Sequence, residues 1–95
     1  MRFQWDPRKA AANLAKHDVS FDEASTVFGD PLAGTVPDPE HSADESRFVT
    51  IGQSAKGRLI VVVHADRGEE IRIISARRPT AGEKKKHAEG QVEGC

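Results

Sequence analysis

The residue types best suited to chemistry lie between Arg77 and His87. Glu83 and His87 are four residues apart and would share one face of a helix, with Lys84 three residues before His87. The pair Arg77-Arg78 comes just before this segment. Arginine can bind phosphate oxygens through two parallel hydrogen bonds, and an imidazole or a carboxylate can move protons. Together these groups could cleave RNA without a metal, by stabilising the crowded phosphorane and transferring the two protons.

An ordinary helix is the alternative for the same residues. A solvated helix often carries a pair of opposite charges at this spacing, and on these residues alone that interpretation is favoured. A second polar cluster could hold a divalent ion, but its spacing fits no recognised metal motif, and we expect no metal and no cofactor; it consists of Asp38, Glu40, His41, Asp44 and Glu45. Two isolated histidines have structural interpretations, with His17 closing a helix and His64 ending a strand.

Two apolar strands must position this chemistry. They run from Leu59 to His64 and from Glu70 to Ala76, and Asp66-Arg67-Gly68 joins them. Apolar residues at consecutive positions predict strands covered on both faces, so this hairpin is expected at the centre of the sheet. Five arginines fall in or beside it: Arg58, Arg67, Arg72, Arg77 and Arg78. An arginine in a core strand must reach an edge, pair with an acid or meet a ligand.

Helix-start signals and alternating patterns place the other elements around the hairpin. Asp6-Pro7 begins a helix to about Lys16, and the capping box of Ser20 and Glu23 begins another that ends at Gly29. Thr80 and Glu83 form a further capping box, for a helix to about Gly90. Short strands are expected at residues 3–5, 32–36 and 47–53, with Trp5 more often a core anchor than a base-stacking residue. The order predicts an α+β fold, an antiparallel meander with the helices on one face.

The totals indicate one domain, residues 1–90, with a disordered tail at residues 91–95. The one cysteine is Cys95, and no secretion signal or long apolar run is evident, so we expect a cytoplasmic protein without a membrane span. The net charge of -1 hides an asymmetry: residues 1–56 hold six basic and nine acidic residues, whereas residues 57–87 hold eight and four. The second segment could present a positive surface to a polyanion such as RNA, or simply an ordinary charged sheet rim.

Several motifs in order give the chain a resemblance to the BrnT toxins, a branch of the RelE-like ribonucleases of bacterial type II toxin-antitoxin pairs. The N-terminal marks are Phe3-Gln4-Trp5-Asp6 with Lys9, Asn13 and His17, then Ser20-Phe21 with Glu23-Ala24 and Phe28. The middle marks are His41-Ser42 with Glu45 and Arg47, then Gly52 and Gly57-Arg58. The strongest mark is the segment Ile71-Arg72-Ile73-Ile74-Ser75-Ala76-Arg77, with Glu83.

The resemblance implies a RelE-like fold and a metal-independent endoribonuclease that inhibits translation by cutting RNA. It also implies a hetero-oligomer with a BrnA-like antitoxin, a ribbon-helix-helix DNA-binding protein. Arg58, Arg72 and Arg77 match the basic positions of the family and Glu83 matches its acid, whereas His87 stands where the family tends to carry a tyrosine. That substitution favours one alternative, a catalytically weak or inactive binding module that acts as a corepressor with the antitoxin.

The proposed site places a geometric demand on the second strand of the hairpin. Arg72 and Arg77 are five residues apart, so in an ideal strand they would point to opposite faces. A bulge or a strong twist is needed if both are to reach one site.

Overall fold

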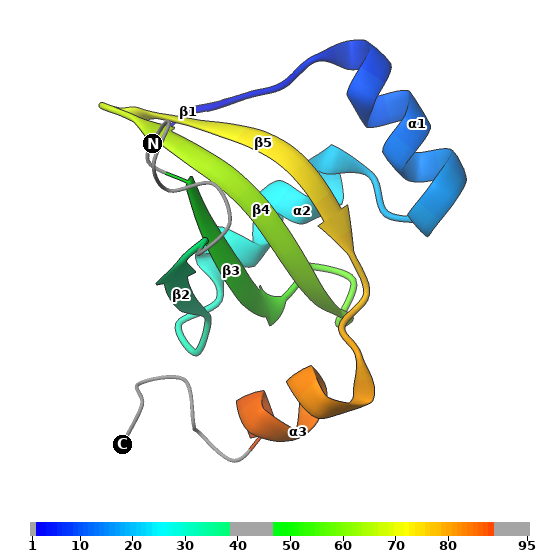
Figure 1. Ribbon diagram of the computed structural model, residues 1–95, viewed down its shortest axis with the longest axis vertical. Helices are drawn as coiled ribbons and strands as arrows, with labels where there is room; N and C mark the ends of the chain where they lie inside the picture. The colour runs from blue at the N-terminus through cyan, green and yellow to red at the C-terminus, as the bar shows by residue number, and fades with distance from the viewer. Residues whose placement is uncertain (1, 39–46, 89–95) are drawn as a thin grey trace.

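The computed structural model describes residues 2–38 and 47–88 and shows a five-stranded sheet in the order β1-β5-β4-β3-β2 (Figure 1). The strands are β1 (Arg2–Gln4), β2 (Gly34–Pro37), β3 (Arg47–Gln53), β4 (Leu59–Arg67) and β5 (Glu70–Arg77). The helices are α1 (Pro7–His17), α2 (Phe21–Thr26), the 3-10 turn η1 (Val27–Gly29) and α3 (Ala81–Ala88). The predicted α+β class is confirmed.

The sheet is mixed, with the predicted meander forming most of it. β2, β3, β4 and β5 pair antiparallel with their neighbours in sequence, while β1 pairs parallel with β5. The chain passes through α1 and α2 between β1 and β2, and those helices carry it to the far edge of the sheet. The hairpin β4-β5 therefore lies in the middle, as its apolar composition predicted.

One face of the sheet packs against α1, α2 and η1, which Figure 1 shows at the side of and behind the strands. The core there joins side chains of the helical segment to residues of β4 and β5 on the same face: Val19, Phe21, Ala24, Val27, Ile60, Val62, Ile73 and Ala76. Trp5 packs edge-on against Phe21, with ring centroids 5.9 Å apart, as a core anchor.

A buried amide fixes α1 to the end of β5. The Nδ2 of Asn13 donates to the carbonyl oxygens of Val19 and Ala76, at 2.9 and 2.8 Å, and the Oδ1 of Asn13 accepts from the backbone N of Ala76. Alanines around Asn13 leave room for this close approach. The helix is held by directed hydrogen bonds more than by a wide apolar face.

Two expectations about placement were wrong. The helices do not all cover one face, because α3 lies against the other side, where Val61 is buried and needs cover. His64 does not end its strand: β4 continues to Arg67, and the His64 ring is buried between Phe28 and Phe48. Its two nitrogens are hydrogen bonded to Thr50 and Asp66, and such bonds let a polar ring lie in a core.

Candidate functional site

A β-bulge in β5 brings Arg72 and Arg77 to the same side of the sheet. Val63 lies opposite Ser75 and His64 lies opposite Ile73, so Ile74 is the extra residue. Arg72 then lies opposite Ala65 and Arg77 opposite Val61. Since positions 61 and 65 of β4 share a face, both arginines lie on the face opposite α1 and α2, which we call the open face. The bulge thus puts both arginines on one face despite their odd spacing, opposite β4 positions four residues apart.

Arg72 lies at the β1 end of the open face. Its Nη1 donates to the Oε1 of Gln4 at 3.2 Å, and the Nε2 of Gln4 in turn donates to Glu70. Within the described residues Arg72 makes no ion pair. Its guanidinium is thus oriented by a neutral amide and faces no carboxylate partner among the described residues.

Arg77 is held by Glu83 through two parallel hydrogen bonds. Its Nη1 donates to Oε1 at 2.9 Å and its Nη2 donates to Oε2 at 3.0 Å. These bonds, and then that from the backbone N of Thr80, lower the pKa of Glu83 to about 2 despite partial burial. The same pairing raises the pKa of Arg77. Glu83 is consequently a weak base at neutral pH, suited to orienting Arg77 more than to accepting a proton.

A cavity of about 300 Å³ lies between α3 and the open face. Its apolar floor is formed by Val36, Val49, Ile51 and Val61, and its wall by Glu83, Lys86 and His87. The Nδ1 of His87 is buried there without a hydrogen-bond partner among the described residues. Lys86 lines the cavity and Lys84 does not. Lys86 was not among the residues predicted from the sequence, although it lies three residues after Glu83 on the same helix face.

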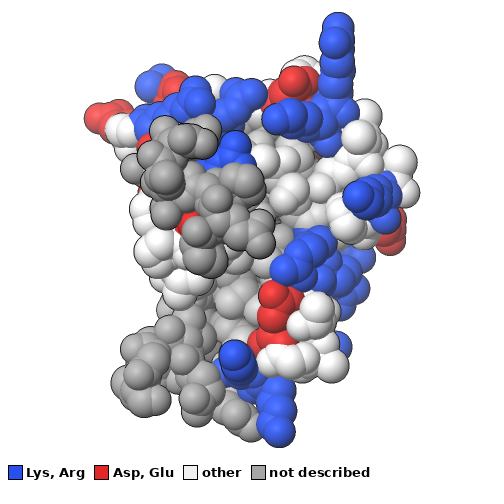
Figure 2. Space-filling model, viewed as in Figure 1, with Lys and Arg blue, Asp and Glu red and all other residues white. Residues whose placement is uncertain are grey.

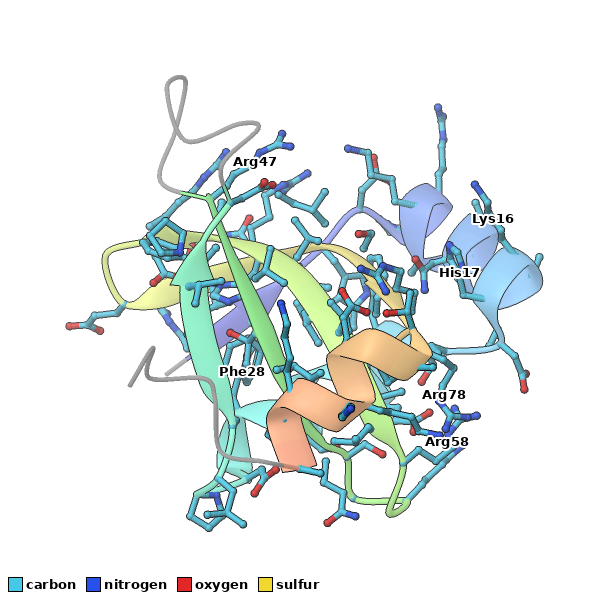
Figure 3. All side chains as sticks on the ribbon, turned by 60° about the horizontal axis from the view of Figure 1, so that its bottom comes forward. Lys16, His17, Phe28, Arg47, Arg58 and Arg78 are labelled. Carbon is cyan, nitrogen blue, oxygen red and sulfur yellow. The ribbon has the colours of Figure 1, made fainter. Side chains whose placement is uncertain are left out.

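Arg58 is separate from this group, on the helix-covered side of the sheet. Its Nε donates to the Oε2 of Glu23 at 2.9 Å, its Nη2 pairs with the Oε1 of Glu23, and Nη2 also donates to the carbonyl oxygen of Asp18 at 3.0 Å. Glu23, with a side chain 2% exposed, also accepts from the Oγ of Ser54. Arg58 lowers the pKa of Glu23, and Glu23 raises that of Arg58. Figure 3 shows Arg58 at the end of the sheet near Arg78, away from Arg47.

The structure thus brings four of the five predicted site residues to the open face and leaves Arg58 apart from them. The metal-type cluster of residues 38–45 lies outside the described residues except for Asp38, which is buried. Figure 2, viewed toward the open face, shows basic side chains at several separate places, with acidic atoms beside basic ones near α3. None of the helices in residues 2–38 and 47–88 has the length and apolarity to cross a bilayer.

Comparison with known proteins identifies the family and supports the fold. Residues 5–83 match the family model described as the ribonuclease toxin BrnT of type II toxin-antitoxin systems. The crystal structure of the Brucella abortus ribonuclease toxin BrnT is similar, with a TM-score of 0.66 and 25% identity, over 84% of this chain and 97% of that one. No curated protein matches. The family match spans most of the sequence, and the chain belongs to the BrnT family of ribonuclease toxins of type II toxin-antitoxin systems.

Proposed function

We propose that this chain is a metal-independent endoribonuclease of RelE-like type, which inhibits translation in the cytoplasm by cutting RNA on the open face. The observation that carries the proposal is the bulge at Ile74, which places Arg72 and Arg77 on one side of the sheet. Two guanidinium groups on one face suit a phosphodiester, because each can donate two hydrogen bonds to phosphate oxygens.

The proposed reaction is an internal displacement at phosphorus. The 2'-oxygen loses its proton and bonds to phosphorus, and the bond to the 5'-oxygen breaks as that oxygen gains a proton. Arg72 and Arg77 would stabilise the extra charge on the phosphorane, with Glu83 keeping Arg77 in position. His87 would move a proton, since it lies in the cavity beside Glu83 and its Nδ1 is free among the described residues. Arg58 would contribute by holding α2 against the hairpin, away from the RNA.

Arg77→Ala tests this assignment most directly. Expression of the parent chain without an antitoxin is expected to arrest growth, and the purified protein to cut RNA at discrete sites in the presence of EDTA. Arg77→Ala should relieve the arrest and slow cleavage by about a hundredfold or more, because a charge-stabilising donor is lost. Arg8→Ala, which removes an exposed arginine of α1, is the matched control and should behave like the parent. Full toxicity of Arg77→Ala would show that the assignment is wrong.

We further propose a BrnA-like ribbon-helix-helix antitoxin as the partner, bound as a hetero-oligomer. A second candidate function, a corepressor without nuclease activity, is favoured by one observation: both terminal nitrogens of Arg77 already bind Glu83. Intact RNA in the same assay, together with tight binding of the antitoxin, would support the corepressor over the enzyme.

A further inference from the structure

A second concave site lies between α1 and β5, outside the group of residues assigned to cleavage. It has a volume of about 230 Å³, and its lining includes Lys9, Lys16 and His17 from α1 with Ile74 and Ser75 from β5. We call it the α1 groove. Lys9 and Lys16 are seven residues apart, or about two helical turns, so they project from the same flank of α1. Figure 3 shows Lys16 and His17 on the flank of α1 beside the sheet.

The α1 groove has a strongly one-sided charge. Its lining contains no acidic residue, and neither Lys9 nor Lys16 makes an ion pair within the described residues. Asn13, the polar residue between them, already uses its amide in hydrogen bonds to the backbone. The charged groups that remain able to bind a ligand include the exposed ammonium groups of Lys9 and Lys16. A concave site lined by one sign of charge attracts the opposite ion.

The groove and the open face meet at Ser75. Ile74 is the bulged residue, and Ser75, opposite Val63, lies on the same side of β5 as Arg72 and Arg77 and between them along the strand. An anionic chain bound by these two arginines would therefore pass Ser75, which also lines the groove. A single phosphate could not use both places, whereas a polymer of phosphates could.

We propose that the α1 groove binds backbone phosphates of single-stranded RNA that flank the bond to be cut. The RNA then crosses the bulge between Arg72 and Arg77 and follows α1, with Lys9 and Lys16 each contacting a phosphate. This inference rests on the proposed function for its ligand. It assigns the groove to affinity and to the length of RNA engaged, and it gives the groove no part in the chemical step.

The test is salt-dependent binding of a non-cleavable probe. A fluorescent 2'-O-methyl RNA of 12 nucleotides is titrated with the parent chain and with Lys9→Glu/Lys16→Glu at several salt concentrations. The double variant should bind about tenfold or more weakly at low salt, and the slope of log K against log salt should become shallower by about 1.4, the value for two lost contacts to a single strand. Lys56→Glu/Lys85→Glu is the control, with the same charge change at exposed positions outside the groove. It should keep the parent slope, and thermal unfolding should show that all three proteins are folded.

Each outcome separates this inference from the proposed function. An unchanged slope in the Lys9/Lys16 variant overturns the groove assignment even if the parent cuts RNA. A parent that binds the probe through the groove but cuts no RNA preserves the assignment and refutes the nuclease. Equal slopes for the two double variants would mean that the change in net charge alone explains the weaker binding, and would overturn the groove assignment. Loss of antitoxin binding with unchanged RNA binding would assign the groove to an acidic protein segment instead, and would also overturn the proposal.

Discussion

Two arginine-glutamate pairs in this small fold have the same chemistry and different surroundings. Arg58 and Glu23 meet on the helix-covered side, where the Glu23 side chain is 2% exposed and also bonded to Ser54. Arg77 and Glu83 meet on the open face, where their side chains are 40% and 37% exposed. A buried carboxylate that loses its partner has no water to replace it, whereas an exposed one does. The first pair therefore holds the fold together, and the second leaves its arginine within reach of a ligand.

Removing the buried acid should have the largest effect on stability. Glu23→Ala leaves Arg58 and Ser54 without their shared acceptor and detaches α2 from the turn before β4. We expect a loss of about 2–3 kcal/mol in the free energy of unfolding, somewhat under the usual cost of breaking a fully buried pair, because Arg58 keeps some contact with water. Urea denaturation followed by circular dichroism measures it. A loss below about 0.5 kcal/mol would mean that burial does not distinguish the two pairs.

Changing the exposed acid should affect RNA cleavage more than stability. Glu83→Gln can still accept the backbone N–H of Thr80, as glutamine does in a capping box, so stability should fall by under about 1 kcal/mol. RNA cleavage should slow by about tenfold or more, because Arg77 loses the charged partner that orients it. Cleavage rates of Glu83→Gln and of the folded fraction of Glu23→Gln make the comparison. If Glu23→Gln is the more impaired nuclease, the division of roles is reversed.

Lowering the pH is expected to have the smallest effect on stability. The pKa of Glu83 is lowered in the folded protein from its ordinary 4.5 to about 2, so the ionised form favours folding. That contribution is fully present above about pH 4.5 and is lost as the pH falls toward 2. It should be absent in Glu83→Gln, so the stability difference between parent and variant should shrink across this window. A difference that is constant from pH 5 to pH 2.5, measured by thermal unfolding, would contradict the ionised pair.

Local signals predicted most of the fold. Capping residues gave the starts of the helices, and both the Ser20–Glu23 and the Thr80–Glu83 contacts are present. The face of the sheet that α3 covers could not be predicted, because it depends on the direction of the chain after Arg77, at the end of β5. That direction depends in turn on the bulge, and the sequence Ile73-Ile74 does not reveal which isoleucine is the extra residue. The family resemblance selected Arg58 with the other arginines, because a sequence match carries no information on which face a side chain occupies.

The bulge at Ile74 also determines how β5 can tolerate changes in length. The extra residue shifts the alternation of faces by one position. Ile73 and Ala76 therefore both enter the core although they are three residues apart, and Arg72 and Arg77 both face away from it although they are five apart. Removing this one residue would bring Ile73 and Ala76 to a spacing of two and Arg72 and Arg77 to a spacing of four, so simple alternation would keep both pairs on their present faces. Pairing Ile74 in regular register instead of bulging it would exchange the faces of everything that follows in the strand. In that regular pairing the core would receive Ser75 and Arg77, and Ala76 would leave it. We therefore expect relatives that lack this extra residue to form a regular strand that keeps both arginines on the open face.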